Sequence, residues 1–200
     1  MPYARKDTIA WKPASYYHIY NRGVSKATLF REQDNYVYVL RKTRYYCEKL
    51  QLGMIAYCLM PNLYHFLVRQ DGEHPAGLLP QRIFNGYTKA YNRLYGHSGT
   101  LFERRYQVKQ VESEVHLLHL CRYIHANPIK DGLAAGMEDW PYSNYLEWIG
   151  QRGGKLVDLA FVREHFQSGN DYMDFVADYL HSRRLPEEGL SYLSEFDRWC

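Results

Sequence analysis

The chain has 200 residues, a formal net charge of +3 and a hydrophobic content of 46%. This composition is typical of a globular protein, and the length suits one domain with an extension. No stretch approaches ~18 consecutive apolar residues, which argues against a membrane-spanning helix. Residues 1–13 hold no apolar run, so we expect neither a secretory signal nor a membrane anchor. The four cysteines form no CxxC pair, which predicts reduced thiols in a cytoplasmic protein.

The charge is unevenly distributed along the chain. Residues 151–200 contain six Lys and Arg against nine Asp and Glu, which leaves nineteen against thirteen in residues 1–150. The basic excess of the first 150 residues is what a phosphate-binding surface requires. Because that excess is modest, we expect charge alone to bind long duplex DNA weakly.

Hydrophobic periodicity and turn residues predict an α+β chain. The expected elements, in chain order, are a strand at 16–21, a helix at 34–51, strands at 54–59 and 64–70, a helix at 78–95, a strand within 101–111, a helix at 113–127 and a helical pattern in 151–200. An antiparallel sheet with helices packed on it is the most economical arrangement of these elements. We therefore expect a domain over residues 1–150 and a helical C-terminal extension over residues 151–200.

The strand that comes after Pro61 and Asn62 carries the first candidate site residue. Residues two apart on a strand point to the same face, so Leu63 and His65 share a face and Tyr64 points away. Two histidines at this spacing would bind a metal ion together. Leu63 cannot bind a metal, so the strand offers His65 alone.

The helix expected at 113–127 carries the second group. Ser113 is a plausible N-cap, and an apolar stripe from Leu117 to Ile124 predicts the core-facing side. Tyr123 and Asn127, one turn apart, fall on a different stripe with His116 and His119. Pro128 disfavours helical geometry in the residue before it, so the helix is expected to end at Asn127. A tyrosine with an amide one turn later at a helix end suits a nucleophile beside a metal ligand.

Basic and aromatic residues alternate between positions 82 and 109. Six Lys and Arg lie there against one acid, Glu103, with four tyrosines interleaved. Such a mixture suits single-stranded or hairpin nucleic acid, through phosphate contacts and base stacking. A solvated helix face with a structural tyrosine stripe at 87, 91 and 95 is the alternative. We favour mixed use, in which the tyrosines are partly core and the Arg104-Arg105 pair is functional. The candidate nucleic-acid-binding residues are Arg22, Arg82, Lys89, Arg104, Arg105 and Lys130.

Four motifs, in order, give the chain a family resemblance. They are Tyr17-His18-Ile19-Tyr20-Asn21-Arg22-Gly23, Met60-Pro61-Asn62 with Tyr64-His65-Phe66-Leu67, Phe102-Glu103-Arg104-Arg105-Tyr106, and Tyr123-Ile124-His125-Ala126-Asn127-Pro128. Over about residues 14–150 the chain resembles the REP-associated tyrosine transposases, a branch of the IS200/IS605-like transposases. The resemblance implies a ferredoxin-like, palm-type sheet with the His-bearing strand in its middle.

The resemblance also implies a function and site roles. It implies a metal-dependent single-strand DNA endonuclease and strand transferase of the HUH type (His-hydrophobic-His), acting through a 5′-phosphotyrosine intermediate. By position, Tyr123 matches the nucleophile, and His65 and Asn127 match metal ligands for Mg²⁺ or Mn²⁺. Leu63 occupies the first histidine position, where an apolar side chain should weaken metal binding at least about 10–100-fold. His119, one turn before Tyr123, is the only obvious substitute ligand. His18, on the first strand, could approach the site, and a hydrogen-bonded sheet histidine is its simpler interpretation.

Several functional alternatives stay open at this point. The chain could be an active transposase on single-stranded or hairpin-forming repeat DNA, or an inactive or domesticated relative that binds such hairpins without cutting. Leu63 could equally be a deliberate replacement of His, and an RNA-binding role on the same sheet stays open as well. We expect impaired cleavage with retained DNA binding, a monomer with a homodimer as the alternative, and a cytoplasmic protein that is nucleoid-associated when bound to DNA.

Overall fold

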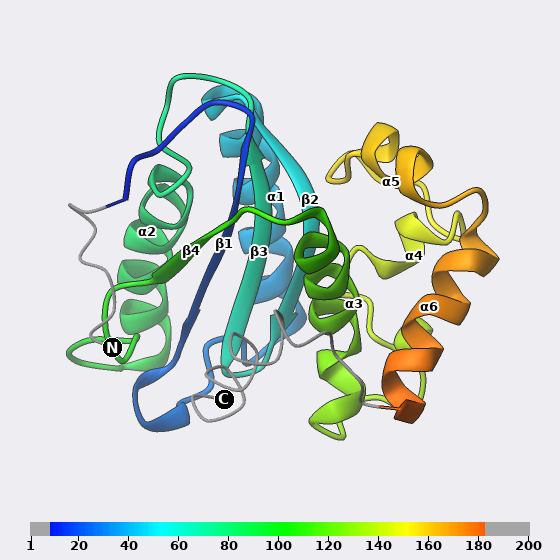
Figure 1. The fold of residues 1–200 in the computed structure, drawn as a ribbon. Helices are drawn as coiled ribbons and strands as arrows, with labels where there is room; N and C mark the ends of the chain where they lie inside the picture. The colour runs from blue at the N-terminus through cyan, green and yellow to red at the C-terminus, as the bar shows by residue number, and fades with distance from the viewer. Residues whose placement is uncertain (1–8, 183–200) are drawn as a thin grey trace.

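The computed structural model describes residues 9–182, which form a four-stranded sheet and the helices packed on it (Figure 1). The elements are β1 (Ser15–Arg22), η2 (Val24–Lys26), α1 (Gln33–Leu50), β2 (Leu52–Met60), β3 (Leu63–Gln70), α2 (Leu78–Tyr95), β4 (Gln107–Val111), α3 (Glu114–Lys130), η3 (Met137–Asp139), α4 (Tyr145–Trp148), α5 (Leu159–His165) and α6 (Gly169–Ser182). Within residues 9–182, no helix combines the length and apolar composition needed to cross a membrane.

The sheet has the order β2-β3-β1-β4, and every pairing in it is antiparallel. With α1 between β1 and β2 and α2 between β3 and β4, this is the ferredoxin-like arrangement that the family resemblance implied. β3, which carries His65, is an inner strand between β2 and β1. The predicted α+β fold and the central place of this strand are therefore confirmed.

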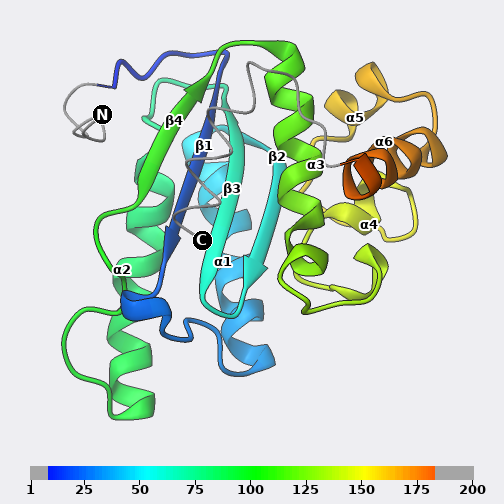
Figure 2. The ribbon, with the colours of Figure 1, turned by 60° about the horizontal axis from the view of Figure 1, so that its bottom comes forward.

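The two faces of the sheet bury two separate hydrophobic clusters. α1 and α2 lie on one face, where they pack on side chains such as Tyr17, Ile19 and Phe66. α3 runs beside β2 on the other side, and α4, α5 and α6 lie farther out (Figures 1 and 2). Alternation along β3 agrees with the predicted pattern, since Leu63 and Leu67 belong to the α3 cluster and Tyr64 to the opposite one.

The outer edge of β2 is covered by the segment that comes after η3. The backbone N–H of Leu59 donates to Tyr142 O, and the Asn144 side chain donates to Ile55 O and accepts from the N–H of Tyr57. An exposed strand edge invites pairing with another chain, and these contacts occupy the edge of β2 over much of its length.

Most predicted boundaries agree with the structure to within two residues, and α2 matches its predicted range. Pro80 is tolerated in α2 because the first turn of a helix has no internal partner for its N–H groups. β4 is shorter than the segment in which it was expected, since residues 102–106 pass as a loop. Cys47, Cys58 and Cys121 are buried free thiols, as predicted, and Cys200 lies outside the described residues.

The prediction that α3 ends at Asn127 is wrong, because the helix continues through Pro128 to Lys130. Proline removes the i→i−4 hydrogen bond of its own nitrogen and crowds the carbonyl of residue i−4, but it leaves the other bonds of the helix in place. The carbonyls of this last turn are bonded nevertheless: Asp131 donates to Asn127 O, and Leu133 donates to Pro128 O. Asn127 therefore lies inside the helix rather than at its end.

Candidate functional site

The candidate site lies where α3 faces β3. The rings of Tyr123 and His65 meet edge to face, with centroids 6.1 Å apart and planes at 86°. Both side chains are buried, at 0% exposure. Two residues that are far apart in the sequence are thus brought together, as the motifs implied.

Leu63 stands two residues before His65 on the same face of β3. It pairs with Arg22 on β1 and Met60 on β2, and its side chain is 2% exposed within the α3 cluster. The position at which a second imidazole would complete a metal-binding pair is therefore filled by packed hydrocarbon.

His18 approaches His65 from the neighbouring strand. His18 Nε2 and His65 Nδ1 are 3.0 Å apart, and the two ring planes meet at an angle of 20°. Burial lowers the pKa of His18 well below its usual range, and that of His65 to about 3, with the nearby Lys130 ammonium as a second cause. Both rings are neutral at neutral pH, so one of them donates its N–H to the other. His18 is the hydrogen-bonded sheet histidine that was expected, with a site residue as its partner.

Two further candidate residues, Asn127 and Lys130, lie on α3. Ser113 caps the helix as predicted by accepting from the N–H of His116, which fixes where α3 begins. Asn127 is buried and its Nδ2 donates to Tyr123 O at 2.9 Å, which leaves Oδ1 as the amide atom that can face a cation. Lys130 Nζ lies 4.3 Å from the centre of the Tyr123 ring, so its charge stands beside the phenol.

The histidine stripe on α3 contributes less. His119 contacts the ring of Phe175 on α6, and burial lowers its pKa to about 4. His119 therefore faces the C-terminal helices and is not placed as a substitute ligand beside His65. His116 is near enough to His18 to lower the pKa of that ring.

The candidate basic residues divide into two groups. Arg22 forms an ion pair with Glu103, and Arg104 lies 3.7 Å from the same carboxylate, at the β1 edge near Leu63. Arg105 is exposed in the same loop. Arg82 and Lys89 are exposed on α2, on the opposite side of the sheet from α3, so the structure does not bring them to Tyr123.

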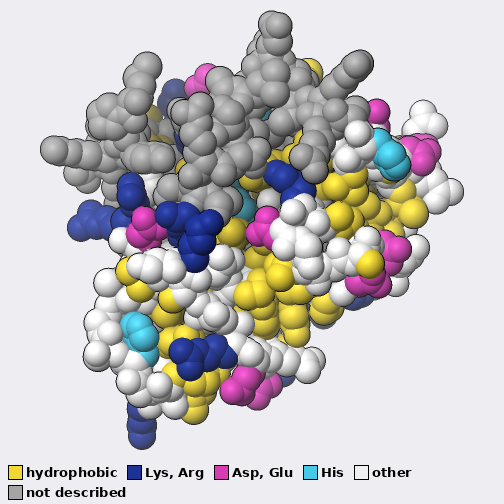
Figure 3. All heavy atoms as spheres, turned by 90° about the horizontal axis from the view of Figure 1, so that it is seen from below, with side chains coloured by type: hydrophobic (Ala, Val, Ile, Leu, Met, Phe, Trp, Pro, Cys, Tyr) yellow, Lys and Arg dark blue, Asp and Glu magenta, His cyan; other side chains and the backbone are white. Residues whose placement is uncertain are grey.

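Figure 3 views the molecule from below. On the left of this view a group of Lys and Arg side chains lies together, with acidic side chains among them. A broad hydrophobic area occupies much of the remaining visible surface.

The tyrosine stripe of α2 is core. Tyr87 and Tyr91 are each 3% exposed, and their hydroxyls donate to Leu29 O and Thr28 O in the segment after η2. The Tyr95 hydroxyl donates to the Asn35 side chain. The expectation that these tyrosines are partly core is confirmed, since Tyr87 and Tyr91 are buried and Tyr95 is half-buried.

A buried polar network that the sequence patterns did not predict holds α3 from behind. His125 Nε2 lies 2.9 Å from Asn144 Oδ1, and His125 Nδ1 lies 2.6 Å from the Tyr172 hydroxyl on α6. Asn144 Oδ1 also accepts from a backbone N–H, so His125 donates to it and accepts from Tyr172. Helix geometry gave one signal for this contact. His125 comes two residues after Tyr123, which places it about 200° around the helix, on the side opposite Tyr123.

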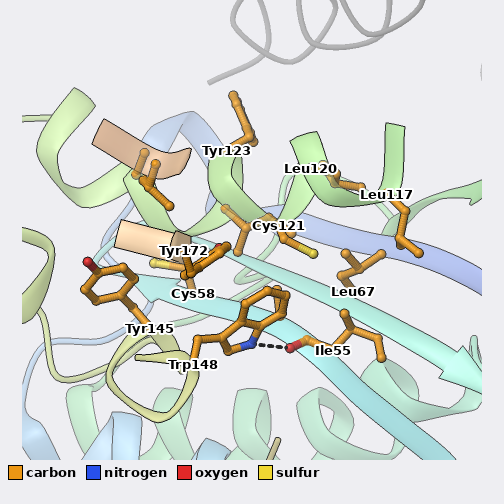
Figure 4. Packing of buried hydrophobic residues seen from close by; sticks show 14 of the residues in the cluster. Ile55, Cys58, Leu67, Leu117, Leu120, Cys121, Tyr123, Tyr145, Trp148 and Tyr172 are labelled. Atoms are coloured by element: carbon orange, nitrogen blue, oxygen red, sulfur yellow. Dashed lines mark hydrogen bonds between the residues drawn. The ribbon is translucent and has the colours of Figure 1, made fainter. Parts of the chain in front are cut away.

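Figure 4 shows this back side of α3. Leu117, Leu120 and Cys121 point from the helix toward the strands, Trp148 donates to Ile55 O, and Tyr172 lies beside them, whereas Tyr123 lies on another side of the helix. The C-terminal helices thus pack against the helix that presents Tyr123, within one hydrophobic cluster.

The donor set fits a metal ion only in part. His65 supplies a neutral imidazole and Asn127 an amide oxygen, whereas Leu63 supplies nothing. Within residues 9–182, no three His, Cys, Asp or Glu side chains are grouped closely enough to hold a metal. Two protein ligands are fewer than the three that hold Zn²⁺ in an open catalytic site.

Comparison with known proteins gives this geometry a family. The family model for IS200-like transposases matches residues 12–127, more than half of the chain. The protein therefore belongs to the IS200-like transposase family. No curated protein matches the chain.

The solved structures that are similar to the chain include the following two. A REP-associated tyrosine transposase bound to a REP hairpin has a TM-score of 0.62 at 15% identity, covering 79% of this chain and 94% of that one. A protein described as a transposase, from Deinococcus radiodurans R1, has a TM-score of 0.40 at 15% identity, covering 68% of this chain and 100% of that one. The first likeness establishes a shared fold.

Proposed function

We propose that this protein binds single-stranded or hairpin-forming repeat DNA and that its DNA cleavage is impaired at one metal-ligand position. One observation carries the proposal: Tyr123 faces His65 across α3 and β3, and buried Leu63 occupies the position beside that histidine. Membership of the IS200-like transposase family supports the DNA substrate. The solved relative bound to a REP hairpin supports hairpins in particular.

The proposed chemistry is transesterification at a phosphodiester. The Tyr123 hydroxyl oxygen forms a bond to phosphorus, the bond from phosphorus to the 3′ oxygen breaks, and the 3′ oxygen leaves with a proton as a free 3′-OH. The product is a 5′-phosphotyrosine that the 3′-OH of another strand can attack in reverse. No nucleotide cofactor is needed, because the energy of the phosphodiester is kept in the protein–DNA bond.

Side chains around Tyr123 have distinct roles in this proposal. A tyrosine has an ordinary pKa near ~10 and is a weak nucleophile when protonated. Lys130, beside the ring, offsets negative charge as it develops. His65 and Asn127 would hold Mg²⁺ or Mn²⁺, which supplies charge neutralisation at the phosphate when bound. Leu63 makes that binding weak.

Phosphate contacts come from the basic residues near the site. Arg22, Arg104 and Arg105 stand at the β1 edge and Lys130 at the end of α3, so a strand reaching Tyr123 passes them. Arg82 and Lys89 would contact DNA only where it extends around α2. We further propose a monomer, because α3 presents Tyr123 to His65 of its own chain while α6 holds its other side.

The test is a gel assay for a covalent protein–DNA adduct on a library of single-stranded hairpin oligonucleotides with Mg²⁺ or Mn²⁺. The chain as it stands is compared with Leu63→His and with Leu63→His combined with Tyr123→Phe. We expect an adduct with Leu63→His only, lost on Tyr123→Phe. Full adduct formation by the unaltered chain would show that cleavage is not impaired.

A second candidate is a hairpin-binding protein without cleavage, favoured by the same Leu63 packing. It predicts that neither the chain nor Leu63→His forms an adduct, although both bind the hairpins. Competition between DNA and RNA hairpins of one sequence separates a DNA-binding from an RNA-binding protein, since the 2′-OH and A-form geometry alter the fit.

A further inference from the structure

His18 and His65 form a contact that the strand register puts in place. His65 pairs with Tyr20 on β1, and His18 lies two residues before Tyr20, so the two histidines are diagonal neighbours on one face of the sheet. Both side chains are fully buried, and His18 Nε2 lies 3.0 Å from His65 Nδ1. The contact therefore uses Nε2 of one ring and Nδ1 of the other.

The two imidazole rings meet edge to edge rather than face to face. Their centres lie 5.2 Å apart, about the nitrogen–nitrogen distance plus the radii of the two rings, and their planes differ by 20°. An N–H in the plane of one ring thus points at the in-plane lone pair of the other. Tyr20 lies nearly parallel to both rings, with its centre 4.9 Å from His18 and 6.0 Å from His65, and restricts their rotation.

One proton occupies this contact, and the geometry allows it on either ring. Burial keeps both rings neutral, and a neutral imidazole has one N–H and one lone pair. If His18 donates, His65 carries its own proton on Nε2, which is the tautomer that a histidine prefers in water. If His65 donates from Nδ1, its Nε2 keeps a lone pair.

The surroundings of His65 favour the second arrangement. The two nitrogens of an imidazole point away from each other, so His65 Nε2 faces away from β1, toward the side where α3 runs (Figures 1 and 2). α3 places Tyr123 and the Lys130 ammonium there. An ammonium can only donate hydrogen bonds, so a lone pair on Nε2 is the favourable form beside it. Lys109 faces His18 in a similar way, but its effect on the pKa of that ring is smaller than that of the neighbouring histidines.

We propose that His18 is a positioning residue, which accepts a hydrogen bond from His65 Nδ1 and thereby holds His65 as the tautomer with a lone pair on Nε2, directed away from β1. This is the form of His65 that can bind a cation. Because Leu63 supplies no second imidazole, the proposed cation site depends on the form that His65 takes. The use of the lone pair rests on the proposed function, whereas the tautomer is a property of the chain by itself.

Nuclear magnetic resonance measures the tautomer in the unaltered chain. Long-range proton–nitrogen correlation spectra of isotopically labelled protein at pH 7, without DNA or metal, distinguish a ring nitrogen that carries a proton from one that carries a lone pair. His65→Gln identifies the signals of His65 by their loss. We expect Nδ1 of His65 to carry the proton and Nε2 to carry the lone pair.

Three variants test whether His18 sets this tautomer. His18→Phe keeps a flat ring and removes the acceptor, so the proton of His65 should move to Nε2, as in water. His18→Gln returns an acceptor near the position of Nε2, because its amide oxygen extends about as far from the backbone, and should restore the Nδ1 proton. His119→Phe is the matched control, because His119 contacts Phe175 instead, and it should leave the His65 signals unchanged. Thermal melts establish that each variant folds.

A second measurement tests the use of the lone pair. Electron paramagnetic resonance gives the Mn²⁺ affinity of Leu63→His, alone and combined with His18→Phe or His18→Gln. Partners that orient a metal-binding histidine are worth roughly 10–100-fold in metal affinity. We expect His18→Phe to weaken Mn²⁺ binding by that factor in the Leu63→His background, and His18→Gln to keep most of the affinity.

The outcomes separate this proposal from the proposed function. A proton on Nε2 of His65 in the unaltered chain, or an Nδ1 proton that survives His18→Phe, overturns the positioning role whether or not hairpins bind. Equal Mn²⁺ affinity with and without His18→Phe overturns it as well. If Leu63→His binds no Mn²⁺ although the tautomer is as expected, the cation site of the proposed function fails and the assignment of His18 stands.

Discussion

The two faces of the sheet are both well packed, but they bury different kinds of polar group. On the α1 and α2 face the buried hydroxyls of Tyr87 and Tyr91 end on backbone carbonyls. On the α3 face three histidines are buried, namely His18, His65 and His125, each bonded to another side chain. The first face is a structural core, and the second combines a core with groups that can titrate or bind a ligand.

The difference lies in what the buried polar groups on each face can do. A tyrosine hydroxyl on a carbonyl satisfies a polar group within apolar packing, whereas charging a buried histidine carries a free-energy cost that keeps it neutral. Groups with shifted pKa values are enriched at functional sites, so we expect the site on the α3 face.

Core truncations should separate the two faces most strongly. Phe66→Ala and Leu67→Ala remove adjacent, fully buried side chains that point to opposite faces of β3. We expect the free energy of unfolding to fall by roughly 3–5 kcal/mol for Phe66→Ala and 2–5 kcal/mol for Leu67→Ala, measured by urea denaturation. Hydrogen exchange should rise first in α1 and α2 for Phe66→Ala and in α3 for Leu67→Ala. Equal loosening of the same helices by both would show that the faces are one cooperative core.

Acid should weaken the α3 face selectively. Burial lowers the pKa of His125 from 6.5 to about 4, so between these values the unfolded chain binds a proton that the folded chain does not. The contribution of this residue to the free energy of unfolding is therefore fully present above pH 6.5. It falls by about 3 kcal/mol as the pH drops toward 4. Chemical denaturation at pH 7 and pH 5 measures the effect. His74→Gln, at an exposed position, should leave the pH dependence unchanged, and a pH-independent stability would contradict the prediction.

Tyr172→Phe probes the contact between α6 and α3. It removes the hydroxyl that bonds His125 Nδ1 and leaves that buried nitrogen without its partner. We expect a loss of about 1–3 kcal/mol in the free energy of unfolding. Tyr45→Phe, at a 45% exposed tyrosine on α1, is the matched control and should change stability little. A similar loss for both variants would argue against a specific role of the network.

The smallest change in the free energy of unfolding should come from an ion pair on the exposed surface of α1. Arg44 and Glu48 form an exposed i,i+4 ion pair at 3.2 Å, with side chains 48% and 66% exposed. Glu48→Ala should change stability by less than about 0.5 kcal/mol, and added salt should remove the difference. A loss above about 1 kcal/mol in denaturant titrations would show that this surface contributes more than solvent screening allows.

Local sequence patterns were sufficient to predict most of the secondary structure and to show which side chains of β3 share a face. Alternation placed Leu63 and His65 together and Tyr64 opposite, and the apolar stripe of α3 selected its buried side, because both periodicities are properties of the backbone itself. The end of α3 was missed because a proline near a helix C-terminus removes only one hydrogen bond. Whether the helix then continues depends on the contacts of the last turn, here the bonds from Asp131 and Leu133.

The amino-acid sequence alone thus specified the strands and helices, the meeting of Tyr123 with His65 through its family motifs, and the lack of an imidazole at Leu63. Three-dimensional packing was needed to show that His18 bonds His65, that α6 holds α3 through His125, and that the α2 tyrosines are core. It was also needed to show that Tyr64, Phe84 and Phe102 line a pocket. Those contacts join residues far apart in the chain, and they depend on strand register and helix packing, which no local pattern encodes.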